Sequence, residues 1–157
     1  MNPLVVNVPD SQPTSGEPFG NDGWFPDIDQ EHLRDSVRIH GDIPEQRLRE
    51  ACLYAMASVN RELRDWQSQQ IESGYSSLAQ VPGTQMGGES QLLMLYRRAV
   101  YSTVKADLTE RYRDHDSTGA GHDRADDLSP GIDEQRRNAR WAISAILGLS
   151  RSTVELI

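Results

Sequence analysis

The sequence has little of what stabilises small secreted proteins or anchors a chain in a membrane. It contains one cysteine, Cys52, among 157 residues, so no disulfide can form within the chain, which fits a reducing compartment. No apolar run approaches the roughly 20 residues needed to span a bilayer. The first residues, MNPLVVNVPD, lack the charged and long apolar regions of a signal peptide. We therefore expect a protein made and used in a cytoplasm.

The sequence motifs of common enzyme classes are also missing. No segment matches a phosphate-binding GxxxxGK[ST] loop, a dinucleotide-binding GxGxxG, a zinc-binding HExxH or a nucleophile elbow GxSxG. Cys52 lies in a helical pattern without a neighbouring histidine, which is typical of a small buried hydrophobic residue. We expect neither enzymatic activity nor a cofactor.

One polar segment resembles part of a metal site but is incomplete. The run from Asp114 to Gly119 matches the first half of a calcium loop, yet the position of the bidentate glutamate is Ala125. The histidines and aspartates nearby have no usual zinc spacing. We expect a solvated loop over residues 115–129 and no metal. A hydrolase built on His115, Asp116 and His122 remains a minor alternative.

The chain is polar and acidic overall. Its hydrophobic content is 36%, its mean hydropathy is −0.64, its net charge is −8 and its pI is about 4.9. Such a chain is a poor general binder of duplex DNA, because that affinity comes mainly from cations on phosphates. The low hydrophobic content indicates exposed tails or large partner-facing surfaces.

Residues 1–27 form an extended arm rich in proline and glycine. They contain five prolines and neither lysine nor arginine, and proline at that density opposes both helix and sheet. Phe19, Trp24 and Phe25 close this arm and are expected to be anchors. The sequence leaves open whether they dock on their own domain or on another chain.

The rest of the chain predicts an all-α fold. We expect a small helical bundle at residues 28–148, with a short helix near 29–39 capped by Asp29 and main helices near 43–70, 89–113 and 130–147. The third main helix is expected to begin at Ser129–Pro130. Residues 71–88 read as a connection, with one turn at Ser77–Ala79 and turn signals at Pro82–Gly83 and Gly87–Gly88.

The helix near 89–113 is predicted to be central. Its apolar residues cover about half the helical wheel at 100° per residue, which is more than a surface helix needs, and its polar stripe is narrow. The apolar residues are Leu92, Leu93, Tyr96, Val100, Val104, Leu108 and Tyr112. The polar residues are Arg98, Ser102, Lys105 and Thr109. Arg97 and Arg111 lie inside the apolar sector, so they must be paired or reach a neighbouring element or subunit.

Basic residues on the last two predicted helices allow two interpretations. With interleaved tyrosines, the helix from Tyr96 to Arg113 could be a nucleic-acid face of a small helical regulator. Alternatively the arginines, Arg137 among them, meet the acidic surface of a neighbouring copy, which the net charge favours. Trp141 falls opposite the apolar stripe of the last helix, so we expect it to contact another element or subunit.

The C-terminal residues 149–157 read as a docking tail. Thr153, Val154, Glu155, Leu156 and Ile157 combine β-prone residues with alternation around a charge. A five-residue strand has no partner in a helical chain, which favours strand addition to another protein. The alternative is a frayed terminus or an apolar plug on the core of the same chain.

Several long segments resemble one known family in the same order along the chain. They are VNRELRDWQ, SGYSSL, GES, YRRAVYSTVKADLTERYRDHDSTGAG, RRNARWAISAILG and TVELI. Over about residues 20–157 the sequence is similar to the head completion proteins, or head–tail connectors, of temperate contractile-tailed phages.

This resemblance implies a structural virion protein at the head–tail junction that is present in the host cytoplasm during assembly. It implies binding to the portal protein after DNA packaging, stabilisation of the filled head, and a platform for a neck or tail-completion protein. Related adaptors form rings, usually dodecameric. On this basis residues 153–157 are expected to bind the portal, and Arg97, Arg111, Arg137 and Trp141 to lie between subunits. Packaged DNA would pass through the channel without specific binding.

Overall fold

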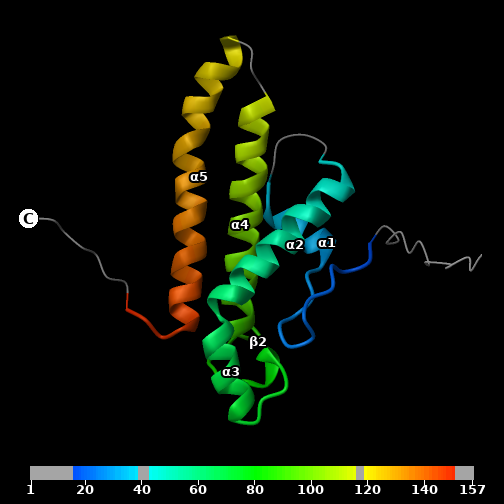
Figure 1. Cartoon of the computed structure of the whole chain (residues 1–157), viewed down its shortest axis with the longest axis vertical. Helices are drawn as coiled ribbons and strands as arrows, with labels where there is room; N and C mark the ends of the chain where they lie inside the picture. The colour runs from blue at the N-terminus through cyan, green and yellow to red at the C-terminus, as the bar shows by residue number, and fades with distance from the viewer. Residues whose placement is uncertain (1–15, 39–42, 116–118, 151–157) are drawn as a thin grey trace, which may run out of the picture.

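The predicted helical bundle is confirmed. The computed structural model describes the backbone of residues 16–38, 43–115 and 119–150, and the side chains in these ranges except those of 112–130. Two long antiparallel helices, α4 (Gln91–His115) and α5 (Gly119–Ile146), form a hairpin, and α2 (Glu45–Glu62) crosses α4 (Figure 1). The short α1 (Gln30–Ser36) and α3 (Arg64–Glu72) complete the helical part.

The first helix begins as its sequence predicts. The Oδ1 atom of Asp29 accepts a hydrogen bond from the backbone N–H of His32 at 2.8 Å, which satisfies one donor of the first turn. Leu33 is buried on the inner face and α1 ends at Ser36.

The single helix expected over residues 43–70 is wrong in one respect. It is divided at Leu63, whose φ of −92° and ψ of 0° leave the helical range. Leu63 is fully buried. The break lets α3 turn away from α2, as Figure 1 shows, and Trp66 of α3 packs against the core.

A 3₁₀ turn and a small hairpin connect α3 to α4. The turn at Leu78–Gln80 confirms the one predicted there. Strands β1 (Gln85–Met86) and β2 (Glu89–Ser90) pair antiparallel around Gly87 and Gly88. Both glycines have positive φ, at 60° and 83°, as a tight two-residue turn between strands requires.

The polar loop predicted over residues 115–129 is wrong for most of its length. Helix α5 begins at Gly119, and Pro130 lies inside it rather than in its first turn. Residues 119–131 contain no β-branched side chain, so little in them opposes a helix except glycine and one proline. Proline removes one backbone hydrogen bond, yet α5 continues through Pro130 to Ile146.

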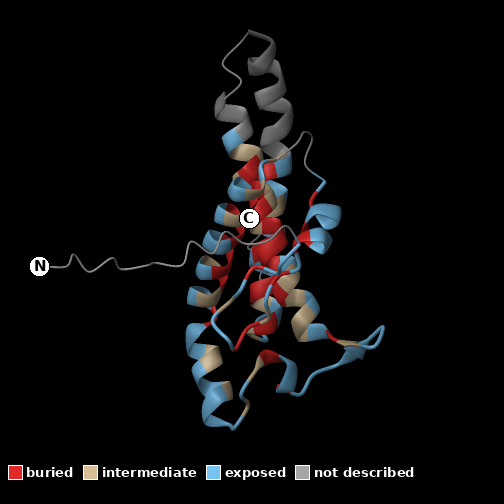
Figure 2. Ribbon diagram, turned by 90° about the vertical axis from the view of Figure 1, so that its right-hand side faces the viewer, coloured by how far each residue is buried: buried red, intermediate tan, exposed pale blue. Residues whose placement is uncertain are grey.

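The central position of α4 is confirmed. Its buried residues face several directions because α2, α5 and the N-terminal segment all pack on it; they are Tyr96, Ala99, Val100, Tyr101, Ser102, Val104, Ala106 and Leu108. Ser102 was assigned to the polar stripe from the sequence and is instead buried. Figure 2 shows the buried residues running through the middle of the molecule.

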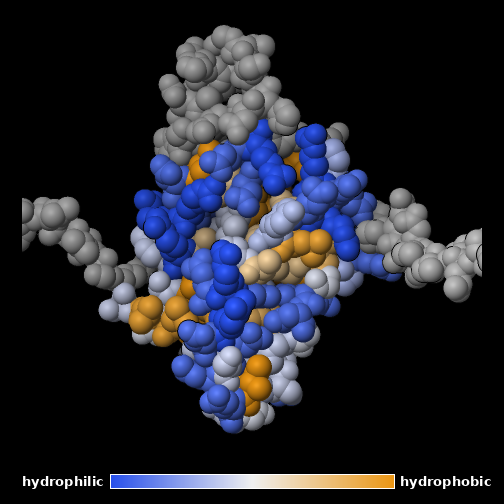
Figure 3. Space-filling model, viewed as in Figure 1, coloured by the Kyte–Doolittle hydropathy of each residue, from blue (hydrophilic) through white to orange (hydrophobic). Residues whose placement is uncertain are grey.

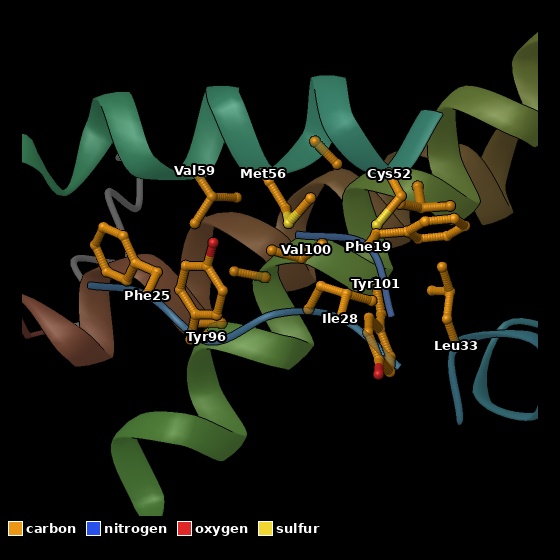
Figure 4. Packing of buried hydrophobic residues seen from close by; sticks show 14 of the residues in the cluster. Phe19, Phe25, Ile28, Leu33, Cys52, Met56, Val59, Tyr96, Val100 and Tyr101 are labelled. Carbon is orange, nitrogen blue, oxygen red and sulfur yellow. The ribbon is translucent and has the colours of Figure 1, made fainter. Parts of the chain in front are cut away.

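Residues 19–28 pack into this same core. Phe19, Trp24, Phe25 and Ile28 are buried, and a bridge of two backbone hydrogen bonds, 2.8 and 3.0 Å, joins Phe19 to Ile28. Figure 4 shows this segment between α2 and α4. The packed unit therefore includes part of the predicted arm.

Candidate functional site

The three aromatic anchors of the arm dock on their own chain. The Phe25 ring stacks on Tyr96 of α4 with centroids 4.7 Å apart. Trp24 meets Trp66 of α3 edge-on at 6.0 Å, and its Nε1 donates to the Tyr75 carbonyl at 3.0 Å. The sequence left open whether these aromatic residues dock on their own domain or on another chain, and the described residues show them docked on their own domain.

A closed ring of hydrogen bonds fixes the arm to α2 and α4. The Asn21 amide donates to the Tyr96 hydroxyl at 2.7 Å, that hydroxyl donates to Asn60 Oδ1 at 2.6 Å, and the Asn60 amide donates to Asn21 Oδ1 at 2.8 Å. Burial is the main cause that raises the pKa of Tyr96 far above its usual value. Sequence reasoning missed this network, since its three members are far apart in the chain.

The arginines proposed to lie between subunits have different surroundings in one chain. Arg97 pairs with Glu89 of β2, and about a third of each side chain stays exposed. Arg111 is exposed near Asp107. The Arg137 guanidinium lies 5.2 Å from the centroid of the Trp141 ring. Trp141 is 37% exposed, which agrees with its predicted place outside the core stripe of α5.

A charge cluster that the sequence did not single out joins α4 to α5. Arg136 pairs with Glu110 and lies 3.6 Å from Asp107. Partial burial raises the pKa of the Asp107 carboxyl, while Arg136 opposes that rise. These pairs fix the two helices against each other near the end of the described side chains.

A groove of about 520 Å³ lies between α1, α4 and α5. Its walls carry cations and hydroxyls as well as apolar groups; the lining residues are His32, Ser36, Val37, Met94, Arg97, Arg98, Tyr101, Ser102, Lys105, Gln135 and Asn138. The basic residues of α4 were noted from the sequence, but their meeting with α1 was not, because it depends on tertiary packing.

The proposed nucleic-acid face loses two of its aromatic residues. Tyr96 and Tyr101 are buried, so neither ring can stack on a base. The side chain of Tyr112 lies outside the described residues. The nucleic-acid-binding alternative is therefore left with a cationic groove in which neither Tyr96 nor Tyr101 offers an exposed ring.

Other predicted sites fall partly outside the described part of the chain. This holds for the tail 153–157 and for the side chains of His115, Asp116 and His122. Within the described residues, no group of three or more histidine, cysteine, aspartate or glutamate side chains could hold a metal ion. No helix among these residues is long and apolar enough to cross a membrane. Cys52 is a buried free thiol whose pKa burial raises to about 12.

Most of the surface in Figure 3 is hydrophilic, with small separate hydrophobic areas. Among the residues whose side chains the structure describes, the large exposed apolar ones are scattered over several elements; they are Leu53, Tyr54, Ile71, Met86, Met94, Trp141 and Leu149. A surface of this kind favours contacts that combine charge with a few apolar anchors.

Comparison with known proteins identifies the family. The model of the phage head completion protein family (GPL) matches residues 19–157. The chain is 40% identical over 147 residues to the head completion/stabilization protein of Escherichia phage P2, an alignment that covers 93% of this chain and 87% of that protein. No solved structure matches the chain. The predicted resemblance is thus confirmed, and the chain belongs to the phage head completion protein family.

Proposed function

We propose that this protein is the structural component that joins the portal after DNA packaging, closes and stabilises the filled head, and presents a platform to the tail. The observation that carries this proposal is the family match over residues 19–157, together with the relative from phage P2 that is named for head completion and stabilization. The protein would occupy the head–tail junction of the virion and be present in the host cytoplasm before assembly.

The proposed partners are the portal protein, further copies of this chain and a neck or tail-completion protein. A ring, dodecameric as in the related adaptors, would surround the DNA exit channel. Arg97, Arg111, Arg137 and Trp141 are proposed to lie between neighbouring copies. In support of this, Arg111 and Trp141 are exposed and about a third of the Arg97 side chain is exposed, so a neighbouring copy could contact them without unfolding the core.

The net charge of −8 suits a protein beside moving DNA. Like charge facing the channel would keep phosphates from binding while DNA passes. Packaged DNA is therefore proposed to be a transient neighbour and not a ligand.

The tail 149–157 is proposed to dock on the portal, with Thr153, Val154, Glu155, Leu156 and Ile157 as its contact residues. The described chain ends its last helix at Ile146, and Leu149 beyond it is 60% exposed. An apolar, β-prone segment following an exposed exit from the bundle suits strand addition to a partner.

Deleting residues 153–157 tests the portal contact. We expect the truncated protein to keep its helical content and melting temperature, because the last described helix ends at Ile146, before the deleted residues, and to be lost from purified DNA-filled heads. Full-length protein carrying Ser150→Ala is the control and should be recovered with the heads. Truncated protein that still co-purifies with filled heads at the wild-type ratio would show that the tail is not the anchor.

A further inference from the structure

The groove between α1, α4 and α5 is built before any partner arrives. The Tyr101 hydroxyl and Nδ1 of His32 are 2.8 Å apart and share a hydrogen bond, which joins the α1 wall to the α4 wall. Tyr101 and Val37 are both buried and form part of the apolar lining. A preformed groove needs little ordering when a partner binds, so less binding free energy is lost.

The charged side chains that line this groove are cationic. Arg97, Arg98 and Lys105 project from one face of α4, and the groove lining within the described residues includes no aspartate or glutamate. Arg97 is compensated by Glu89. Arg98 has only the neutral Asn138 oxygen at 3.5 Å, and Lys105 has no carboxylate partner among the described side chains. Two cations are thus left to meet an anionic group in a chain whose net charge is −8.

The chain itself supplies an acidic segment at the end of the α4–α5 hairpin. Residues 114–123 contain three aspartates and neither lysine nor arginine. Helix α4 runs without interruption to His115, and at 1.5 Å per residue Arg98 lies about 25 Å from that end. A continuous helix cannot fold back over this distance, so the acidic end can reach Arg98 only in another molecule.

We propose that the groove binds the acidic end of the α4–α5 hairpin, residues 114–123, of a second copy of this chain. The inference rests on the proposed ring and names its two surfaces. The contact joins different surfaces of identical chains, and a head-to-tail contact of this kind closes into a ring when its rotation permits. Arg98 and Lys105 would attract the aspartates, and the apolar wall with Met94, which is 40% exposed, would exclude water around them.

Reversing the charges on each surface tests this pairing. The groove variant carries Arg98→Glu and Lys105→Glu, and the end variant carries Asp114→Lys, Asp116→Lys and Asp123→Lys, all in the full chain. Sedimentation at low salt should show that wild type associates with rising concentration, and that each variant alone loses at least about tenfold in association. Mixing the two variants should restore association, because each acidic surface then faces a basic one. Arg47→Glu with Arg61→Glu, at exposed positions of α2, is the control of equal charge change and should associate as wild type does.

Three results would overturn the inference. One is a wild-type chain that stays monomeric at millimolar concentration in low salt. Another is a groove variant that associates normally, or a mixture that does not recover. The third is retention of a short DNA duplex by wild type but not by the groove variant, without self-association, which would assign the groove to phosphates. Counting copies on filled heads separates the failure of the groove contact from the failure of the proposed ring. If the groove variant forms rings on heads as wild type does, only the groove contact is refuted. If wild type is present on heads as single copies, the ring is refuted.

Discussion

The N-terminal segment and the α4–α5 hairpin are held in place by different kinds of interaction. Residues 19–28 insert aromatic side chains between α2 and α4 and close a ring of three hydrogen bonds with Asn60 and Tyr96. The α4–α5 hairpin also has buried apolar contacts, from Ala142, Ile143 and Ile146, but it adds partly exposed ones, such as Arg136 with Glu110 and Arg137 with Trp141. The first arrangement stabilises a monomer, whereas the second leaves charges and an indole ring accessible to a partner.

The two regions therefore contribute differently to the stability of the fold and to association with other molecules. Buried aromatic groups contribute to the free energy of folding because they leave water completely. Exposed ion pairs contribute little to that free energy, typically about 0–1 kcal/mol, but they can determine which surfaces meet. We therefore expect substitutions in the first region to unfold the protein and those in the second to change its association.

The largest effect on folding is expected from Phe25→Ala. The ring is buried and stacks on Tyr96, so its removal should lower the free energy of unfolding by about 3–5 kcal/mol. Urea denaturation of the isolated protein measures this change. The matched control is Tyr54→Ala on α2, since that aromatic side chain is 65% exposed, and its loss should cost less than about 1 kcal/mol. Equal losses at the two positions would contradict the placement of the N-terminal segment in the core.

A smaller effect, specific to alkaline pH, is expected from the buried tyrosines. Burial raises the pKa of Tyr101 to about 12 and that of Tyr96 further, while tyrosine in an unfolded chain ionises near pH 10. Above pH 10 the unfolded state therefore loses protons that the folded state keeps. Stability that is fully present below pH 10 should fall as pH rises, by up to about 1.4 kcal/mol per pH unit for each such tyrosine.

Tyr96→Phe should separate this pH effect from the loss of hydrogen bonds. It removes one titrating hydroxyl, so the decline of stability between pH 10 and 11 should become shallower. At pH 7 the same variant should be destabilised by about 1–3 kcal/mol, because Asn60 and Asn21 lose a partner. Urea denaturation across this pH range makes the measurement. An unchanged slope in Tyr96→Phe would mean that its hydroxyl ionises normally.

The smallest effect on monomer stability is expected from Trp141→Ala. Its ring is 37% exposed and lies outside the apolar stripe of α5, so the melting temperature should fall only slightly. Ring formation on portal-bearing heads should weaken strongly, since a large aromatic group at a contact contributes more than most other residues. Thermal unfolding and copy counting on heads give the two readouts. A large loss of melting temperature with normal ring formation would place Trp141 in the core and out of the interface.

Helical periodicity in the sequence was sufficient for much of the fold. The wide apolar sector from Leu92 to Leu108 predicted a central helix, and α4 is surrounded in the structure. Local chemistry also located the Asp29 cap. These features depend on neighbours within one turn of helix, so a single sequence contains the information.

Two predictions failed where a local signal did not decide the outcome. Ser129–Pro130 is a good start for a helix, yet α5 begins earlier, at Gly119, and continues through it. Leu63 has a side chain that suits a continuous helix, yet the chain bends there while that side chain stays fully buried.

The sequence by itself determined the helical class, the central helix, the family resemblance and the apolar character of Phe19, Trp24 and Phe25. Only the tertiary structure decided where those aromatics dock, which asparagines meet Tyr96, and that Arg98 and Lys105 share a groove with His32. The physical reason is how far apart in the sequence the interacting residues lie. Helix formation follows from residues three and four apart, whereas a groove or a hydrogen-bond network brings together residues tens of positions apart, whose meeting depends on how the whole chain packs.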